Sequence, residues 1–313
     1  MEFIKGFTFG FMTPRGKFSD KEAKQSLNLL VEETNSNTII FTLAAYQDTA
    51  HSEEVDYTGS HMPTDEELIE LITLAKSKGL RIIIKPLVNC RNGVWRAHIN
   101  FFDQDVVCEP KWSNWFESYT KYQLHYAKIA EQVGAEMLVV GCEMVQTERK
   151  AAEWRKLIEE VRKVYTGLIT YNTDKYQEDH VTWWDAVDVI SSSGYYPIND
   201  WDNQLERIHR IVKKFNKPFF FAEAGCPART GSSIIPNNWE HKGELNLQEQ
   251  EEYYKIMFEK CKKESWICGF GLWDWKTHLY PKADGIKDDD YSVYGKPACQ
   301  VIKEFYRSVN KSN

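Results

Sequence analysis

Short apolar segments alternate along the chain with longer amphipathic ones, and this alternation predicts the secondary structure. Eight apolar runs, several bounded by Gly or Pro, fit buried parallel strands. They cover residues 3–10, 37–43, 80–87, 137–141, 168–172, 187–192, 218–223 and 267–272. The segments between them predict helices at 20–33, 64–78, 113–133, 148–165, 182–186, 202–215, 248–263 and 297–308, of which 182–186 is short and aromatic.

Capping residues mark where two of these helices begin. Ser19 followed by Glu22, and Thr64 followed by Glu67, have the spacing of a capping box. Gly79 suits the left-handed position that ends the second helix.

Strands that alternate with helices predict a single (β/α)8 TIM barrel. No Pro/Gly/Ser-rich linker, charge block or low-complexity tract divides the sequence, so we expect one domain spanning residues 1–313. A doubly wound open sheet is the alternative, and the lack of a glycine-rich nucleotide loop after the first strand disfavours it.

The connections between elements differ in length. Helix-to-strand connections are brief, whereas three strand-to-helix connections are long: 88–112, 224–247 and 273–296. In a barrel the long set opens on the end where active sites are built, so the sequence predicts an elaborated cleft there.

Two of the apolar runs lead into acidic residues. The run at 137–141 leads through Cys142 to Glu143, and the run at 218–223 ends in Glu223. Each Glu could merely cap the next element, but two strands that deliver two carboxylates to one face favour glycoside hydrolysis. That reaction needs one carboxyl group to protonate the leaving oxygen and another to attack or to activate water.

Composition narrows the range of partners. A net charge of -7 with scattered basic residues argues against nucleic acid and anionic membranes, and it favours a neutral substrate. The chain holds 11 Trp, which suit a surface that stacks against a flat ligand, a Trp-rich core being the alternative.

The cysteine, histidine and acidic patterns predict no cofactor and no metal. Seven Cys without a CxxC pair predict reduced thiols and a cytoplasmic protein, because no signal peptide is visible, although a secreted protein stripped of its leader would look the same. No apolar run approaches a membrane span. The eight His lack HxH or HExxH spacing, and Asp288–Asp290 reads as a solvated loop rather than a calcium site. No Gly-x-Ser-x-Gly elbow is present.

Several motifs carry a family resemblance. Gly141-Cys142-Glu143, Phe221-Ala222-Glu223 and Gly271-Leu272-Trp273-Asp274-Trp275 resemble the retaining glycoside hydrolases of clan A. The segment from Lys5 to Gly10, Lys85-Pro86, and Gly93-Val94-Trp95-Arg96 are similar to glycoside hydrolase family 113, over nearly the whole chain.

The resemblance implies activity on β-1,4-mannan and manno-oligosaccharides. It makes Glu143 the general acid/base, Glu223 the nucleophile and Trp273 the platform beneath the sugar at the cleavage site, with Trp275 as a further substrate-binding aromatic. It also implies an aromatic hydroxyl that orients the nucleophile, which Tyr195 or Tyr196 could supply.

One residue departs from the clan pattern. Many members have Asn directly before the acid/base, where it holds the sugar 2-hydroxyl, but here Cys142 stands there. Asn172, Asn89 and Lys85 are the candidates to bind that hydroxyl instead, and Lys85 could equally hold a carboxylate.

Further tryptophans, and Arg96, are expected either in the cleft or in the packed layers of the protein. Trp95 and Arg96, in a long loop, are expected to form cleft wall. We expect four other tryptophans to pack in the core or against the outside of the barrel: Trp112, Trp115, Trp183 and Trp184.

Together these observations predict a retaining endo-type β-1,4-mannanase, monomeric by default, that takes β-mannan or manno-oligosaccharides as substrate. The alternatives are a retaining enzyme acting on another β-linked hexose, such as glucose, and a carbohydrate-binding barrel without catalysis.

Overall fold

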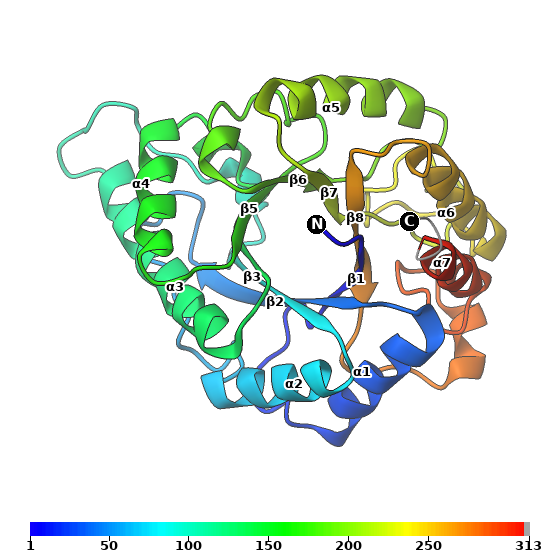
Figure 1. Cartoon of the computed structure of the whole chain (residues 1–313). Coiled ribbons are helices and arrows are strands. Elements are labelled where there is room, and N and C mark those ends of the chain that lie inside the picture. The colour runs from blue at the N-terminus through cyan, green and yellow to red at the C-terminus, as the bar shows by residue number, and fades with distance from the viewer. Residues whose placement is uncertain (310–313) are drawn as a thin grey trace.

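The strands of the computed structural model, which describes residues 1–309, form one closed parallel barrel in the order β1 to β8 (Figure 1). They are β1 (Ile4–Phe9), β2 (Thr38–Gln47), β3 (Arg81–Cys90), β4 (Met137–Cys142), β5 (Leu168–Thr173), β6 (Val189–Ser193), β7 (Phe219–Glu223) and β8 (Ile267–Trp275). Because β1 pairs in parallel with β8, the doubly wound sheet is wrong and the predicted (β/α)8 barrel is confirmed.

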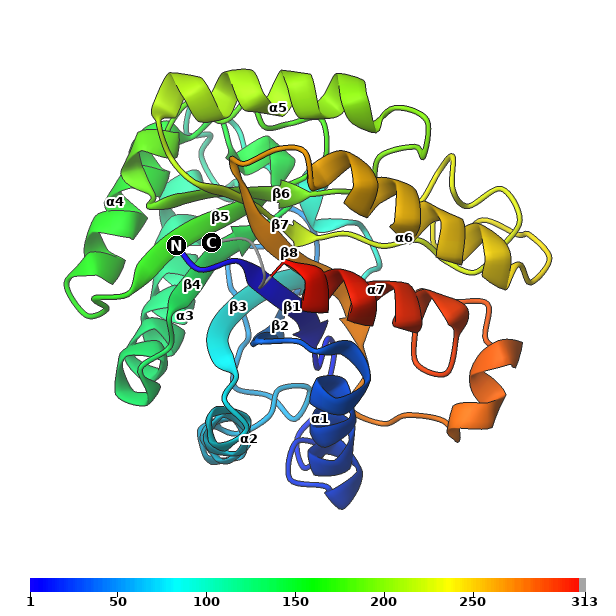
Figure 2. The same ribbon diagram turned by 45° about the vertical axis from the view of Figure 1, so that its right-hand side comes forward.

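The α-helices form a ring outside the strands (Figure 1). They are α1 (Lys21–Thr34), α2 (Asp65–Ser77), α3 (Trp112–Val133), α4 (Ala151–Arg162), α5 (Trp201–Phe215), α6 (Leu247–Cys261) and α7 (Pro297–Ser308). Between β5 and β6 the chain forms only a short 3-10 helix, η3 (Trp184–Ala186), which is shorter than the helix predicted at 182–186. Figure 2 shows α7 lying between α6 and α1, beside the strands that close the barrel.

Helix starts were predicted with mixed success. Thr64 and Glu67 form the predicted capping box of α2, and Gly79 after the helix has a φ of 79°. Helix α1 instead begins after Asp20, whose side chain makes no capping bond because it pairs with Lys17 and His278; the predicted Ser19 cap is therefore wrong.

The interior of the barrel is a small apolar cluster, and a much larger one fills the layer between strands and helices. The inner cluster consists of Ile4, Ile40, Ile83, Met137, Val139, Val189, Phe220 and Ala222. In the outer layer the Trp154 and Trp183 rings stack with centroids 5.0 Å apart. All four tryptophans predicted to pack are buried there: Trp112, Trp115, Trp183 and Trp184.

The seven cysteines are free, as predicted, and five of them are buried. Within residues 1–309, no helix combines the length and the apolar character needed to cross a membrane.

Candidate active site

A cavity of about 830 Å³ opens at the carboxyl ends of the strands. The three long strand-to-helix connections all contribute to its wall, through residues such as Trp95, Trp239 and Tyr291. The predicted location of the cleft is therefore confirmed, and Trp95 and Arg96 both line it as expected.

Glu143 and Glu223 face this cleft together. One carboxylate oxygen of each lies within 4.8 Å of the other and of the Cys142 Sγ atom. Glu223 is the last residue of β7, whereas Glu143 follows β4 with a left-handed φ of 51°, fixed by a 2.7 Å hydrogen bond from its N–H to the Asn172 carbonyl. A non-glycine residue in that conformation is strained, and such strain often occurs at functional sites.

Three groups surround the Glu223 carboxylate. Lys85 Nζ donates to Oε1 at 2.5 Å, the Tyr195 hydroxyl donates to Oε2 at 2.9 Å, and Cys142 Sγ lies 3.4 Å from Oε1. Burial by itself raises the pKa of Glu223, but the Lys85 ammonium and these hydrogen bonds outweigh burial and lower it. Glu223 is therefore a buried, ionised carboxylate.

Glu143 has a different environment. Arg96 Nη1 donates to its Oε2 at 3.1 Å, and Ser193 Oγ donates to its Oε1 at 2.6 Å. Asp174 lines the same cleft, and its pKa is raised to about 7 by burial and then by the charge of Glu143, although Lys175 lies 3.3 Å away. Additional negative charge in this part of the cleft is therefore unfavourable.

Lys85 and Asn172 lie beneath the cleft and link the two carboxylates. Both side chains are fully buried, and Lys85 Nζ donates to Asn172 Oδ1 at 2.7 Å. Asn172 Nδ2 then donates to Ser193 Oγ at 3.1 Å, which completes a hydrogen-bonded chain from Glu223 to Glu143. Since both side chains are fully buried and neither lines the cleft, the expectation that Lys85 or Asn172 binds a sugar hydroxyl is wrong. Lys85 has the alternative role, as a carboxylate partner.

Asn89 is the third of these candidates, and it does line the cleft. Its Oδ1 accepts a 2.8 Å hydrogen bond from Arg96 Nη2. Its amide nitrogen donates no hydrogen bond to another residue within 1–309. Asn89 therefore stays a candidate for contact with a hydroxyl.

The adjacent residues Tyr195 and Tyr196 have different hydrogen-bond partners. Tyr195 contacts Glu223, whereas the fully buried Tyr196 donates to Glu178, so Tyr196 is wrong as a cleft residue. Extended backbone turns neighbouring side chains in opposite directions, which explains the difference.

The two tryptophans of β8 also have different surroundings, although residues two apart on a regular strand face the same side. Trp273 lines the cleft, and the centroid of its ring lies 4.8 Å from the centroid of the Phe11 ring. Trp275 points outward and is 1% exposed, and its Nε1 donates to Ser26 Oγ at 3.0 Å. The expectation that Trp275 binds substrate is therefore wrong.

Sequence reasoning missed other residues of the site. Ser193, at the end of β6, is fully buried and contacts Glu143, and its position could have indicated it, because polar residues at the carboxyl ends of barrel strands lie near the active site. Asp174, Asp274 and Trp239 line the cleft, and Trp239 is 62% exposed on the loop after β7. Asp274 belongs to β8, whereas no pattern in the sequence separates Asp174 and Trp239 from ordinary surface positions.

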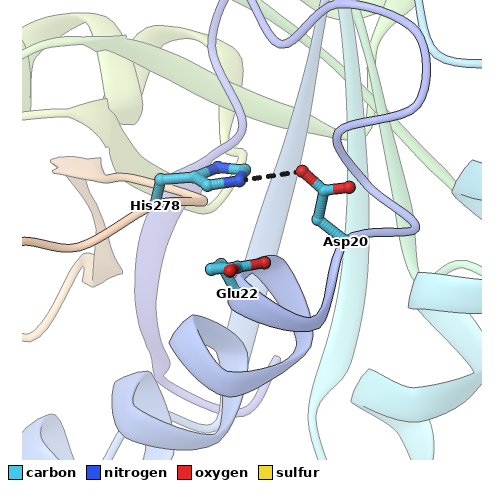
Figure 3. Close-up of side chains that lie close together, drawn as sticks. All are labelled: Asp20, Glu22 and His278. Carbon is cyan, nitrogen blue, oxygen red and sulfur yellow. Dashed lines mark hydrogen bonds and ion pairs between the residues drawn. The ribbon is translucent and has the colours of Figure 1, made fainter.

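Two groups of side chains within residues 1–309 have ligand atoms close enough to hold a metal ion. Asp20, Glu22 and His278 gather at the start of α1, where His278 already contacts Asp20 (Figure 3). Lys17 also pairs with Asp20. The other group is Cys142, Glu143 and Glu223, whose carboxylates are paired with Arg96 and Lys85. A cation would have to displace these partners.

The acidic run at 288–290 also consists of ion-paired residues. Asp288 pairs with Lys296, Asp289 with Arg229 and Asp290 with Lys276, at 2.8, 2.9 and 3.3 Å. These contacts tie the loop after β8 to neighbouring segments, and they differ from the solvated loop that the sequence predicts.

The family model for Glycoside Hydrolase Family 113 matches residues 7–296. The chain belongs to this family. It is a glycoside hydrolase, which the carboxylate pair of the cleft already indicates. Comparison with curated protein sequences finds no match.

Solved structures of family 113 are similar throughout. A GH113 β-1,4-mannanase, determined as a complex, is 64% identical with a TM-score of 0.98, and the match covers 98% of this chain and 100% of that one. The GH113 β-mannanase AaManA from Alicyclobacillus acidocaldarius, in complex with ManMIm, is 38% identical over 99% of this chain and 98% of its own, with a TM-score of 0.95. A β-glucuronidase from Ruminococcus gnavus shares only the fold, at 13% identity and a TM-score of 0.64, over 97% of this chain and 50% of that one.

Proposed function

We propose that this family 113 glycoside hydrolase is a retaining, endo-acting β-1,4-mannanase that cleaves mannan and manno-oligosaccharides. The similarity to β-1,4-mannanases at 64% and 38% identity, each over nearly the whole chain, supports the substrate. The observation that carries the mechanism is the short distance, within 4.8 Å, between an oxygen of Glu143 and one of Glu223.

That distance favours retention of the anomeric configuration. In retaining enzymes the two carboxyl groups stand about 5 to 5.5 Å apart, whereas inverting enzymes need about 6.5 to 9.5 Å to admit a water molecule. In the proposed reaction Glu223 attacks the anomeric carbon and Glu143 protonates the leaving oxygen. Glu143 then takes a proton from the water that releases the sugar from Glu223.

The assignment of the two roles follows from the surroundings of each carboxylate. Lys85 and Tyr195 both donate to Glu223, which keeps it ionised and fixes its orientation, as a nucleophile requires. Glu143 accepts from Ser193 at 2.6 Å and from one guanidinium nitrogen of Arg96, and it lines the cleft, as the proposed acid/base must.

The charges of the cleft support a neutral substrate. Its basic side chains are Arg91, Arg96, Lys175, Arg229 and Lys276, and each is paired with a carboxylate. Unpaired cations, which would select an acidic sugar, are therefore lacking from the part of the cleft wall that lies within residues 1–309. Exposed or half-buried tryptophan rings, such as Trp239 and Trp273, offer flat surfaces for sugar rings.

Hydrolysis rates on mannobiose to mannohexaose and on the matching cello-oligosaccharides test the substrate. We expect the manno series to be cleaved and the cello series to be cleaved far more slowly. Equal or faster cleavage of the cello series would instead favour a glucose-specific enzyme, and no cleavage of either would favour a binding barrel.

Substitution of Glu223 tests the mechanism. We expect Glu223→Gln to lose at least about 10³-fold in kcat, because no covalent intermediate forms. NMR of the first product released by the wild type should show the β-anomer; an α-anomer would exclude the retaining mechanism.

A further inference from the structure

Ten charged side chains line the cleft, and nine of them have an ionic partner. Glu143 pairs with Arg96, Asp174 with Lys175, and Asp290 with Lys276. The remaining partners lie outside the lining: Lys85 for Glu223, Asp56 for Arg91 and Asp289 for Arg229. The tenth side chain is Asp274.

Asp274 has no ionic partner. It is 9% exposed, and the one group that donates a hydrogen bond to its carboxyl group within the described chain, 1–309, is its own backbone N–H. Burial raises its pKa to about 7; Lys276 lowers this value, and Asp290 and Glu223 raise it. The protein therefore satisfies this carboxyl group only in part, and its remaining acceptor capacity is open to a ligand in the cleft.

The position of Asp274 indicates which ligand it serves. Its neighbour Trp273 lines the same cleft, and consecutive Cα atoms are only about 3.8 Å apart. The Trp273 N–H donates to the carbonyl of Ala224 at 2.8 Å, and Ala224 directly follows Glu223. Trp273 and Asp274 both line this one cleft, so hydroxyl groups that project from a sugar stacked on Trp273 can reach Asp274.

We propose that Asp274 is a specificity residue that accepts hydrogen bonds from hydroxyl groups of the sugar stacked on Trp273. This inference rests on the proposed function and deepens it by naming a group that selects the sugar. An ionised carboxyl group has two oxygens and accepts strong hydrogen bonds from hydroxyl groups, so it suits a pair of neighbouring sugar hydroxyls. The substrate thereby satisfies the acid that the protein leaves unpaired.

Two variants, Asp274→Asn and Asp274→Ala, test the proposal in the full chain. We expect kcat/KM on mannotetraose to fall about 10- to 100-fold in Asp274→Ala, the usual cost of losing a hydrogen bond to a charged group, and to fall less in Asp274→Asn, which keeps one acceptor. The melting temperature at pH 8 should stay the same or rise in both variants, since the unpaired carboxylate destabilises the free protein. The control is Asp284→Asn, an exposed acid paired with Lys287, which should leave both quantities unchanged.

Aryl β-mannosides that lack single hydroxyls identify the contact. Removing the hydroxyl that Asp274 binds should slow the wild type but should slow Asp274→Ala much less, because the acceptor is already gone. If every deoxy substrate is slowed equally in both proteins, or if both variants keep wild-type kcat/KM, the proposal is wrong. It is also wrong if the variants lose activity together with a lower melting temperature, which would indicate a structural role.

Failure of the proposed function is a separate result. The wild type is first assayed on the manno and cello series, and the Asp274 variants are then measured on whichever series it cleaves. A wild type that prefers cello-oligosaccharides would refute the mannanase proposal, while the loss of kcat/KM in Asp274→Ala on that series would still support the role of Asp274.

Discussion

At the scale of single residues, the neighbours Tyr195 and Tyr196 differ most clearly in what they contact. Tyr195 donates to Glu223, and Tyr196 donates to Glu178, which is also paired with Arg207. We expect Tyr195→Phe to lower kcat about 10- to 100-fold with little change in stability, because only Glu223, the proposed nucleophile, loses a hydrogen bond. Tyr196→Phe is the matched control: it should keep kcat and lower the free energy of unfolding by about 1 to 3 kcal/mol. Steady-state kinetics and thermal melts of both variants distinguish these outcomes.

Lys85 governs the ionisation of Glu223. Burial opposes ionisation, and the lowered pKa of Glu223 depends on the Lys85 ammonium. Lys85→Met should therefore raise this pKa, so the acidic limb of the kcat/KM profile moves to higher pH. The same pair stabilises the fold above the unfolded-state pKa of about 4.3, and this contribution is lost as the pH falls through the lower folded value. An acidic limb that does not move would show that Lys85 does not control the nucleophile.

The sequence identifies the two glutamates because each ends an apolar run, but it does not identify their partners. Lys85 lies in the middle of an apolar strand, where substrate donor and carboxylate partner predict the same pattern. Only the barrel brings it within 2.5 Å of Glu223, 138 positions away. Asp274 likewise has no signal in the sequence, since a missing partner is a property of three-dimensional packing.

At the scale of secondary structure, the sequence predicts every strand and nearly every helix, but it places their ends less well. Strands β2, β3 and β8 continue past the predicted ends through polar residues, among them Gln47, Asn89 and Asp274. The hydrophobic pattern stops where the strands enter the cleft, whereas the backbone ladder continues. The pattern thus underestimates the strands at the end that holds the chemistry.

Glu148 shows a similar difference at a helix start. The sequence places it in the fourth helix, but α4 begins at Ala151, and the Glu148 side chain turns inward to accept from Tyr171 and Thr173 of β5, both at 2.8 Å. The Tyr171 hydroxyl also accepts the N–H of Met144, which follows Glu143. This buried acid therefore braces the turn that carries the proposed acid/base.

The ionisation of Glu148 gives a prediction for stability. Burial raises its pKa to about 8, so the folded protein keeps it neutral at pH values where the unfolded chain ionises it. This difference destabilises the fold progressively from about pH 4.3 and levels off above the folded pKa. We expect the melting temperature of Glu148→Gln, relative to wild type, to rise from pH 4.5 to pH 8 and then to stay constant. A pH-independent difference would contradict this account.

At the scale of the whole molecule, α7 secures the closure of the barrel. Tyr306 donates to the carbonyl of Gly6 in β1 at 3.0 Å, and Lys5 Nζ donates to the Tyr306 carbonyl at 3.2 Å. Phe305 stacks on Phe258 of α6 with centroids 4.0 Å apart. Helix α7 therefore links the first strand, β1, to helix α6.

Truncating Phe305 tests this closure. We expect Phe305→Ala to lower the free energy of unfolding by about 3 to 5 kcal/mol, because the stack is lost and a cavity replaces the ring. Gln300→Ala, an exposed position of the same helix, is the control and should change stability by less than about 0.5 kcal/mol. Denaturant titrations of both variants measure the difference, and equal midpoints would show that α7 is dispensable for closure.

The asymmetry of the connections has a practical consequence. The short helix-to-strand connections lie at one end of the barrel, and the long connections that line the cleft lie at the other, between strands that pair directly with one another. An engineer can therefore graft the segment that carries Trp239 from a relative with another chain-length preference, and the scaffold should fold unchanged around the same pair of glutamates.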